Sequence, residues 1–516
     1  MTANDFPVLT FLIFFPILGC VGLFFLKKPR IVRVFTLAVS LGEIVLALPL
    51  LRFNLRAAGF QFVESVPWVP AWDLQYFLGV DGISILMVGL TLIMLPVCVL
   101  CSWTSVRERV KEFHFCLLAC GAICIGVFSA LDLVLFYLFY EAILIPIYLL
   151  IAIWGGKERE GASLKFILYT LAGSALLLVV VIAFRIGGDT FSIPELMKHP
   201  FPYRFQCWVF LGMALAFAVK TPLFPFHTWL PAAYVEAPTA GTVVLSAVLA
   251  KMGAYGFLRL CIPLAPSAAG FFAPLLVAMS IASILYGGIV ALGQTDIKRI
   301  IAYSSLAHMG FVVLGIFLFN VKGVQGAVLQ MVNHGITTGA LFVMVGFLFA
   351  RSGSTELREN QGLGKFLPAF MGFWGLLAFA GFGFPGTNNF VGEFLVLTGA
   401  FERNLWLGAV TIPGALLAAA YMLRPTQKMA WGESSGTGKW SDLKGREWVC
   451  LLPLVFLVLY LGVAPSLFLK VMNPTLEQLL SGFHARQPRV ELSLDAVSVP
   501  AKKGILQPSI RETLRP

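Results

Sequence analysis

The chain has 516 residues, of which 59% are hydrophobic and only 12% are charged, and its formal net charge is +11. Soluble domains carry about twice that share of charged residues, so the composition excludes a soluble globular protein and indicates an integral membrane protein. The positive charge does not indicate nucleic-acid binding, because the lysines and arginines stand in short clusters between apolar runs.

Fourteen apolar runs follow one another along the chain, and a bilayer-spanning helix needs roughly 20 such residues. They are expected at 8–26, 34–51, 78–101, 113–130, 132–154, 165–185, 205–235, 239–261, 270–292, 300–320, 324–350, 367–400, 405–424 and 448–470. The first run has no basic residue before it and is too long for the hydrophobic segment of a signal peptide, so we expect it to be retained. We therefore predict an all-α, multi-pass membrane protein.

The basic residues between the runs indicate an orientation. Twenty lysines and arginines follow odd-numbered helices, and eight follow even-numbered ones. Because basic residues accumulate on the cytoplasmic side, we expect the odd-numbered connections to be cytoplasmic and both termini to lie outside. The basic tail after Lys470 argues the other way, although residues far from a helix count for little in this rule.

Two of the runs are interrupted by helix-breaking residues. The run at 205–235 contains Pro222, Pro225 and Pro231, and the run at 367–400 contains a stretch rich in glycine and proline. Discontinuous helices at corresponding places in two halves mark the transport site of inverted-repeat carriers. We predict two inverted five-helix repeats, helices 4–8 and 9–13, in which helices 7 and 12 are discontinuous.

These assignments divide the chain into five segments. Helices 1–3 lie in 1–112, the first repeat in 113–261 and the second repeat in 262–426. A loop and helix 14 follow in 427–470, and a polar C-terminal tail occupies 471–516.

Four charged residues stand inside apolar runs, where a charge costs roughly 2.5–3.5 kcal/mol on insertion scales and usually marks a pathway. They are Glu141 in helix 5, Lys220 before the first break, Lys251 in helix 8 and Glu393 after the second break. A lysine whose carboxylate partner approaches and retreats takes up and releases a proton. We predict that Glu141 and Lys220 form this switch, that Lys251 relays and that Glu393 ends the path. The alternative is a static ion pair of Glu141 with Lys220 that holds two helices together.

Two histidines extend this set. His308 and His334 lie in neighbouring apolar runs, between Lys251 and Glu393 in the sequence. Imidazole titrates near neutrality, so they either relay protons or pack against polar neighbours, and the sequence favours neither.

Three other polar residues are expected to be structural. His227 stands near a helix end, and Asp81 and Asp132 stand at the starts of helices 3 and 5. An aspartate at the start of a helix accepts hydrogen bonds from its free backbone amides, so both are expected to be caps.

No cofactor or metal site is expected on this chain. The nine cysteines are scattered and form no C-x-x-C pair that would hold zinc or an iron–sulfur cluster. The stretch from Gly381 to Gly386 matches G-x-G-x-x-G, but it lacks the strand and βαβ unit of a dinucleotide-binding fingerprint. These glycines are expected to unwind a helix instead.

Five blocks of the sequence carry a further signal. They are LGVDGISILMVGLT at 78–91, FYLFYEAILIPIYLLIAIWG at 136–155, FAVKTPLFPFHTWLPAAYVEAPTAGTVVLSAVLAKMGAYGFLR at 217–259, GQTDIKRIIAYSSLAHMGFV at 293–312 and FPGTNNFVGEFLVL at 384–397. These blocks resemble the antiporter-like membrane subunits of respiratory complex I, the NADH-quinone oxidoreductase, which are shared with multisubunit sodium/proton antiporters. The block at 217–259 is highly specific.

The resemblance implies a function and a setting. It places Glu141, Lys220, Lys251 and Glu393 at the family's channel positions, and a glutamate at 393 is similar to the M-type branch. It implies one proton path coupled to quinone reduction elsewhere in the complex, with L- and N-type chains as neighbours. Flavin, iron–sulfur clusters and quinone would belong to partner subunits, and the location would be a bacterial inner (plasma) membrane.

Three alternatives remain open from the sequence. The nearest is the D-type subunit of a multisubunit cation/proton antiporter or the equivalent chain of a membrane-bound hydrogenase, which share these motifs. A second is a stand-alone secondary transporter for a small solute or ion, and a third is a non-catalytic scaffold.

Overall fold

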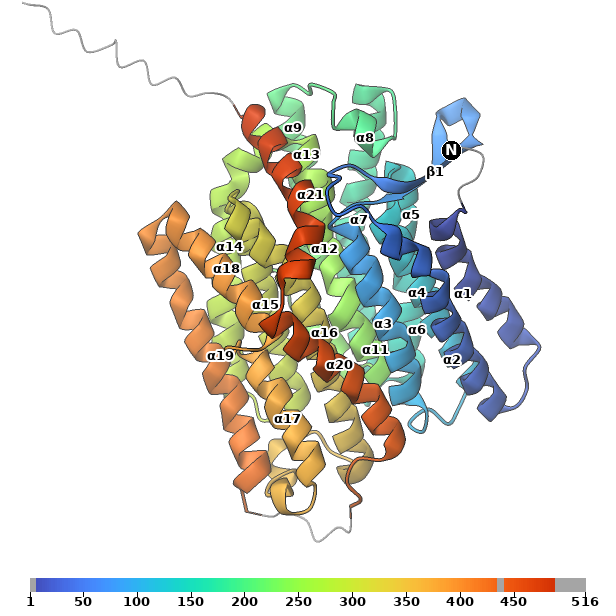
Figure 1. The fold of residues 1–516 in the computed structure, drawn as a ribbon, viewed down its shortest axis with the longest axis vertical. Helices are drawn as coiled ribbons and strands as arrows, with labels where there is room; N and C mark the ends of the chain where they lie inside the picture. The colour runs from blue at the N-terminus through green and yellow to red at the C-terminus, as the bar shows by residue number, and fades with distance from the viewer. Residues whose placement is uncertain (1–5, 434–439, 488–516) are drawn as a thin grey trace, which may run out of the picture.

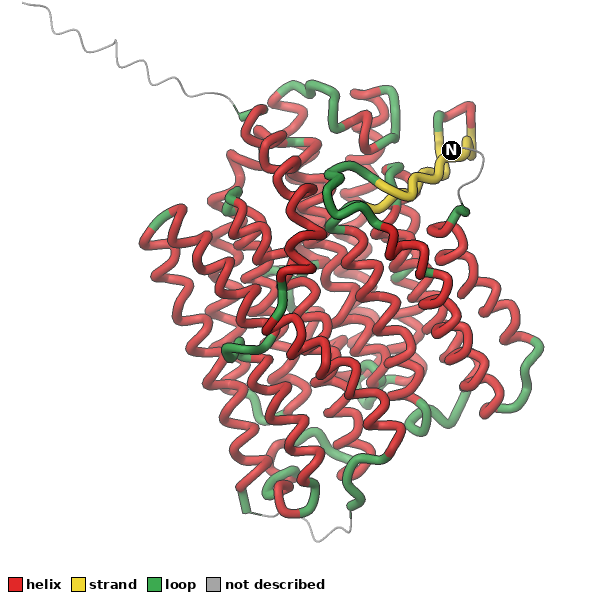
Figure 2. The backbone as a smooth tube through the Cα atoms, viewed as in Figure 1, coloured by secondary structure: helices red, strands yellow, loops and turns green. Residues whose placement is uncertain are grey.

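A computed structural model describes residues 6–433 and 440–487, and it shows a bundle of long helices with a small two-stranded sheet at one end (Figures 1 and 2). The sheet, α8 (Ile193–Leu196) and the chain at residues 6 and 487 all lie at this end (Figure 1). We call it the outer end, following the orientation predicted from the basic residues, and the opposite end the inner end.

The N-terminal part consists of three long helices and the hairpin. Its elements are α1 (Val8–Phe24), α2 (Pro29–Leu46), a 3₁₀ turn η1 (Leu48–Arg52), β1 (Gln61–Val69), a 3₁₀ turn η2 (Pro70–Trp72), β2 (Leu74–Val80) and α3 (Ser84–Ser102). β1 and β2 pair antiparallel. The hairpin was not predicted, since its segment was assigned only as a connection between two helices.

The first expected repeat is made of helices that are divided in several places. It contains α4 (Val110–Ser129), α5 (Leu133–Ala142), α6 (Leu144–Trp154), α7 (Arg159–Gly188), α8, α9 (Tyr203–Lys220), α10 (Trp229–Glu236), α11 (Thr239–Val244), a π turn η3 (Leu245–Leu249), α12 (Ala250–Gly256), a π turn η4 (Phe257–Cys261) and α13 (Ile262–Leu264). Residues 240–264 of this continuous helical stretch are all buried, so it forms the centre of the bundle.

The second expected repeat and the C-terminal part follow. They contain α14 (Pro266–Gly293), α15 (Ile297–Phe317), α16 (Val321–Ser352), 3₁₀ turns η5 (Leu357–Glu359) and η6 (Leu363–Lys365), α17 (Pro368–Gly381), α18 (Asn388–Arg403), α19 (Leu405–Trp431), α20 (Gly445–Val463) and α21 (Ser466–Ala485). In the described residues, eleven helices or continuous helical stretches are long and apolar enough to cross a membrane. Each of the fourteen expected runs coincides with helix, while the number of crossings stays a prediction.

Both expected helix breaks are present, and local chemistry explains each one. α9 ends at Lys220 and α10 begins at Trp229, and between them Pro222 and Pro225 have no amide hydrogen to continue a helix. α17 ends at Gly381 and α18 begins at Asn388. In this second break Gly383 and Gly386 have φ of +72° and +91°, a backbone conformation that glycine adopts without the steric penalty of a Cβ atom.

A matched pair of backbone contacts occurs at corresponding places in the two expected repeats, whose division stays a prediction. Asp132, before α5, forms an isolated β-bridge with Ser192, and Asp296, before α15, forms one with Glu356. Both aspartates also cap the helix that follows them, as was predicted for Asp132. The flanking hydrogen bonds correspond one to one: Leu133 N–H to Phe191 O and Ile193 N–H to Leu131 O in the first, Ile297 N–H to Thr355 O and Leu357 N–H to Thr295 O in the second.

The expected boundary of the tail at 470 was wrong. α21 runs through it, and the apolar side of this helix is buried against the bundle through Met472, Leu476, Leu480 and Phe483. The apolar residues of this helix are spaced three and four apart among polar ones, a weaker signal than a continuous run. The rest of the expected tail, 488–516, lies outside the described residues.

Candidate functional site

A row of buried polar side chains crosses the middle of the apolar bundle. Lys220, Lys251, His334, His308 and Glu393 are each at most 4% exposed. They come from α9, α12, α16, α15 and α18, so helices of both expected repeats contribute. Unpaired charges are costly in such surroundings, and the partners of each side chain therefore decide what the row can do.

Lys251 and His334 are in direct contact at the centre of the row. The Lys251 Nζ atom lies 2.6 Å from Nδ1 of His334 and also donates to the carbonyl of Ser246. An ammonium group can only donate, so Nδ1 of His334 is the acceptor. The other ring nitrogen of His334, Nε2, is buried and has no hydrogen-bond partner among the described residues, which leaves it available to pass a proton on.

His308 links His334 to Glu393. The two imidazole rings lie 5.5 Å apart, centroid to centroid. Nδ1 of His308 is 2.7 Å from Oε1 of Glu393, and the same oxygen accepts a hydrogen bond from Gln330 Nε2 at 3.0 Å. The Tyr421 hydroxyl lies 3.4 Å from the remaining ring nitrogen of His308, Nε2. Lys251, His334, His308 and Glu393 thus form a nearly continuous line.

Glu141 and Lys220 form no ion pair within 4.0 Å in the described part of the chain. Lys220 instead donates to the carbonyl of Tyr140 at 3.4 Å and lies over the Tyr140 ring, 4.5 Å from its centroid. Glu141 is half-buried, and its Oε1 atom is buried without a partner. A static ion pair that holds the helices together is therefore not what this structure contains.

Irregular backbone surrounds these charged residues. α5 ends one residue after Glu141, because Pro146 cannot donate to the carbonyl of Ala142. Lys220 is the last residue of α9, and Lys251 lies between two π turns, a feature that is frequent at functional sites. α12 and α9 approach closely, since a Cβ atom at Gly253 would meet Thr221 and the carbonyl of Phe217.

A cleft at the inner end lies beside the first helix break. It has a volume of 530 Å³ and is lined by His227, Thr228, Lys165 and Glu236 among others. His227 is 3% exposed and its Nδ1 atom is buried without a partner, while Thr228 donates to the Tyr169 hydroxyl at 2.7 Å. The His227 ring packs against the rings of Phe224 and Tyr286, 5.6 and 5.0 Å from centroid to centroid, and its expected structural role stays a prediction.

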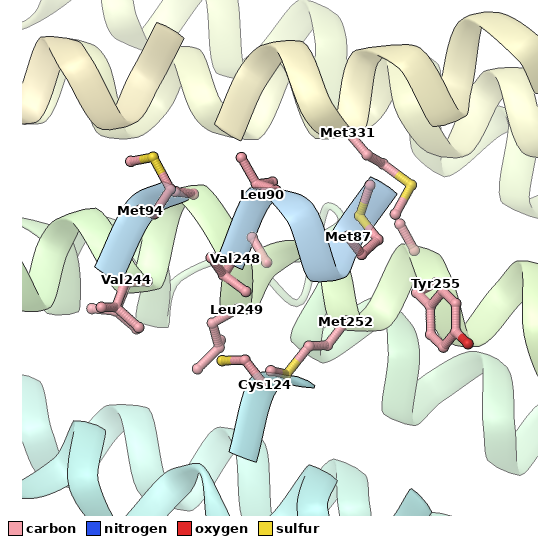
Figure 3. Packing of buried hydrophobic residues seen from close by; sticks show 14 of the residues in the cluster. Met87, Leu90, Met94, Cys124, Val244, Val248, Leu249, Met252, Tyr255 and Met331 are labelled. Atoms are coloured by element: carbon pink, nitrogen blue, oxygen red, sulfur yellow. The ribbon is translucent and has the colours of Figure 1, made fainter. Parts of the chain in front are cut away.

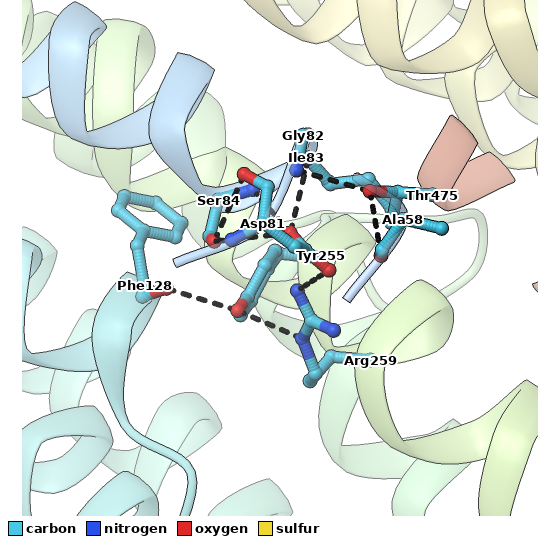
Figure 4. Close-up of polar contacts among 9 residues, drawn as sticks. All are labelled: Ala58, Asp81, Gly82, Ile83, Ser84, Phe128, Tyr255, Arg259 and Thr475. Atoms are coloured by element: carbon cyan, nitrogen blue, oxygen red, sulfur yellow. Dashed lines mark hydrogen bonds and ion pairs between the residues drawn. The ribbon is translucent and has the colours of Figure 1, made fainter. Parts of the chain in front are cut away.

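The sequence did not single out Arg259, which was counted among the outer connections. It is 5% exposed, and its Nη2 atom is 2.6 Å from Oδ2 of Asp81 (Figure 4). The predicted cap is present as well, because Oδ1 of Asp81 accepts from the amides of Ile83 and Ser84. The signal that could have identified Arg259 is its spacing of eight residues from Lys251, which places both on one face of a helix.

The ionisation of Asp132, the cap of α5, is strongly perturbed. Burial raises its pKa to about 6, although the amides of Leu135, Gln75 and Val134 act in the opposite direction. Among the described residues, no group of three or more His, Cys, Asp or Glu side chains is arranged to hold a metal ion.

Comparison with known proteins gives consistent matches. A family model described as NADH:quinone oxidoreductase/Mrp antiporter, TM, matches residues 130–418. The chain is 44% identical to NADH-quinone oxidoreductase subunit M of Rhodobacter capsulatus, over 86% of this chain and 89% of that one. It is 39% identical to NADH-ubiquinone oxidoreductase chain 4 of Arabidopsis thaliana, over 91% and 96% of the two chains.

Solved structures give matching folds. A chain in the structure of respiratory complex I from Thermus thermophilus with bound NADH matches with a TM-score of 0.86 and 32% identity, over 92% of this chain and 99% of that one. A chain of the Mrp complex from Dietzia sp. DQ12-45-1b matches with a TM-score of 0.77, over 92% of this chain and 51% of that one. Its identity of 21% shows a shared fold alone.

Proposed function

Because this chain belongs to the NADH:quinone oxidoreductase/Mrp antiporter family of membrane subunits, we propose that its row of buried lysine, histidine and glutamate side chains conducts protons across the membrane. The chain is an antiporter-like, multi-pass membrane subunit of the oxidoreductase, and its work is proton translocation. The observation that carries the proposed route is the alignment of Lys251, His334, His308 and Glu393. Lys251 Nζ lies 2.6 Å from His334 Nδ1, the two imidazole rings are 5.5 Å apart, and His308 Nδ1 lies 2.7 Å from Glu393 Oε1.

The central transfer is a sequence of short proton movements. Protonated Lys251 gives a proton to Nδ1 of His334, and His334 releases its other proton from Nε2 toward His308. A single water is enough to connect the two rings. His308 then passes a proton from Nδ1 to Glu393, with which it already forms a hydrogen bond. No bond other than N–H or O–H changes, and each imidazole ends in its other tautomer.

Glu141 and Lys220 act as the switch that begins this movement. Two unit charges about 6 Å apart at an effective dielectric constant of about 20 interact by roughly 3 kcal/mol. The interaction energy changes by about this amount when the Glu141 carboxylate moves toward or away from Lys220. Such a movement is possible because neither side chain forms an ion pair with another described residue. Lys220 becomes protonated when the carboxylate is near and releases its proton toward Lys251 when it retreats.

The inner cleft supplies this pair with protons from the cytoplasmic side. It reaches the first helix break, and Lys220 is the residue that ends α9 at that break. His227, with one ring nitrogen free, and the hydrogen-bonded pair Thr228–Tyr169 offer polar steps between the cleft and Lys220.

Other subunits of the complex complete the assembly around this chain. Glu141 is half-buried on a face where Leu138 and Ile145 are 43% and 64% exposed, so a neighbouring chain on that face would shield its carboxyl group. We assign that position to an L- or N-type antiporter-like subunit. Flavin, iron–sulfur clusters and quinone are assigned to partner subunits.

The proposed route is tested by replacing its central lysine. In vesicles containing the assembled complex, Lys251→Met should abolish proton pumping through this subunit, because His334 loses its donor. The matched control is Lys322→Met, since Lys322 is 47% exposed and pairs with Glu402 at the surface. Equal pumping by the two variants, at equal amounts of assembled complex, would refute the route.

A further inference from the structure

The outer end contains a cavity that the route through Glu393 does not use. It has a volume of 410 Å³ and lies between α21, the loop at 58–60, the start of α3 and the outer part of the central helix. Asp81 and Arg259 line it, together with Thr475 and Gln478 of α21. This space is large enough for several waters, and its lining contains both apolar side chains and the polar groups named above, so it offers contact with the outer solution.

Arg259 is held rigidly where this cavity meets the bundle. Besides its contact with Asp81, its Nε atom donates to the Tyr255 hydroxyl at 2.9 Å (Figure 4). Its guanidinium group lies over the rings of Phe60 and Tyr255, 4.9 and 5.2 Å from their centroids. The Tyr255 hydroxyl in turn donates to the carbonyl of Phe128 at 3.0 Å. The cap of α3 uses only Oδ1 of Asp81, so capping does not explain why Arg259 is buried against the other oxygen, Oδ2.

The position of this network relative to Lys251 suggests what it does. Lys251, Tyr255 and Arg259 follow one another at four-residue intervals on one face of the central helix, so Lys251 and Arg259 are about 12 Å apart along it. Tyr255 is therefore the next polar side chain outward from Lys251 on that face. The cavity continues the same direction to the outer end.

Between these polar groups the bundle is apolar and adaptable. Met87 of α3, Met252 of α12 and Met331 of α16 are fully buried in the packed region that holds Tyr255 (Figure 3). Unbranched methionine side chains change rotamer easily, and a narrow apolar constriction blocks water until it widens. In its packed form this region separates Lys251 from the outer cavity.

We propose that Lys251 has an outer release branch, in which a proton passes the methionine constriction and the Tyr255 hydroxyl into the outer cavity, and the Asp81–Arg259 pair is its gate. One N–H bond of the Lys251 ammonium group breaks and leaves a neutral amine; the proton passes by exchange of O–H bonds through water that enters the widened constriction and through the Tyr255 hydroxyl, and one proton appears in the cavity water. The fixed arginine cation repels protons that would return from the cavity. This inference rests on the proposed function, since it needs Lys251 to carry protons.

The test uses the assembled complex in sealed proteoliposomes and the double variant Asp81→Asn/Arg259→Gln, which leaves no buried charge unpaired. We expect the passive proton leak to rise at least twofold and the protons pumped per NADH to fall, while NADH oxidation is not slowed. The matched control is Arg351→Gln/Glu447→Gln, which removes another buried ion pair, 2.5 Å between partners, away from the cavity. It should pump normally without added leak.

Two smaller changes keep the test decisive if the double variant fails to assemble. Arg259→Lys retains the cation and should leak no more than the wild type, whereas Tyr255→Phe removes only the hydroxyl and should slow pumping. Normal leak and pumping in both Tyr255→Phe and the double variant, or equal leak in the double variant and its control, would overturn the branch. If Lys251→Met also pumps normally, the proposed function fails; if Lys251→Met alone is impaired, only the branch fails.

Discussion

Replacing Glu393 by glutamine removes the acceptor at the end of the proposed route with little change in shape. Oε1 of Glu393 accepts from Nδ1 of His308 at 2.7 Å and from Gln330 at 3.0 Å. Glutamine occupies the same volume and can still accept a hydrogen bond, but it cannot take up a proton. The variant therefore separates proton transfer from packing.

The size of the effect follows from the loss of one charge. With about 4 Å between charge centres and an effective dielectric constant of about 20, the carboxylate stabilises positive charge that passes onto the His308 ring during transfer by roughly 4 kcal/mol. Since each 1.4 kcal/mol or so is a factor of about ten in a rate, loss of this stabilisation slows the transfer step on the order of 10³-fold. Transfer through this subunit is then effectively blocked.

The assay measures NADH oxidation and proton uptake in the same inverted vesicles, with the amount of assembled complex determined beside them. The control is Glu402→Gln on the same helix, because Glu402 is 44% exposed and pairs with Lys322. We expect a lower ratio of protons pumped to NADH oxidised, or loss of both activities, in Glu393→Gln only. An unchanged ratio and rate in Glu393→Gln would show that the reasoning about this acceptor is wrong.

Further predictions concern the switch, the relay, the second break and one cap. Lys220→Met should abolish coupled pumping, because Glu141 then has no cation to act on; pumping in vesicles, with the exposed Lys322→Met as a surface control, checks this. His334→Phe should interrupt transfer between Lys251 and His308, and restored pumping in His334→Gln would contradict the requirement for a titratable ring. Gly386→Ala should lower the free energy of unfolding by about 1–2 kcal/mol, because its φ of +91° strains any residue with a Cβ atom. No described atom lies within 4 Å of the new Cβ, so backbone strain alone is tested, and thermal unfolding of the complex measures it. Asp132 has a pKa near 6 in the folded state and a lower one when unfolded, so its contribution to stability is fully present at low pH and is lost as pH rises through 6; Asp132→Asn should flatten this part of the melting-temperature profile.

Much of the architecture could be predicted because the bilayer imposes simple rules on sequence. The apolar runs indicated the helices, and the prolines after Lys220 and the glycines before Asn388 indicated both breaks. The β-hairpin and α21 were missed because neither is a long uninterrupted apolar run. Amphipathic segments such as α21 are identified by three- and four-residue spacing, which is a weaker signal than a long apolar run.

The site was predictable residue by residue but not in its contacts. A charge in an apolar run is conspicuous, so Glu141, Lys220, Lys251 and Glu393 could be named from the sequence. Which side chains touch depends on how distant helices pack, and this decides that His334 meets Lys251 whereas Lys220 meets the Tyr140 carbonyl.

Arg259 was missed for a related reason. It lies near the end of an apolar run, where a basic residue ordinarily reaches the membrane surface. Only the structure shows that it is buried against Asp81.

The measurement that tests the central claim most directly is proton pumping with Glu141→Gln, recorded with NADH-driven quinone reduction in the same vesicles. Exposed Glu160→Gln serves as the control. We predict that pumping and quinone reduction both fall in Glu141→Gln while the complex still assembles, because the switch on Lys220 is lost. Unchanged pumping and unchanged quinone reduction in Glu141→Gln would contradict a proton path controlled by this carboxyl group.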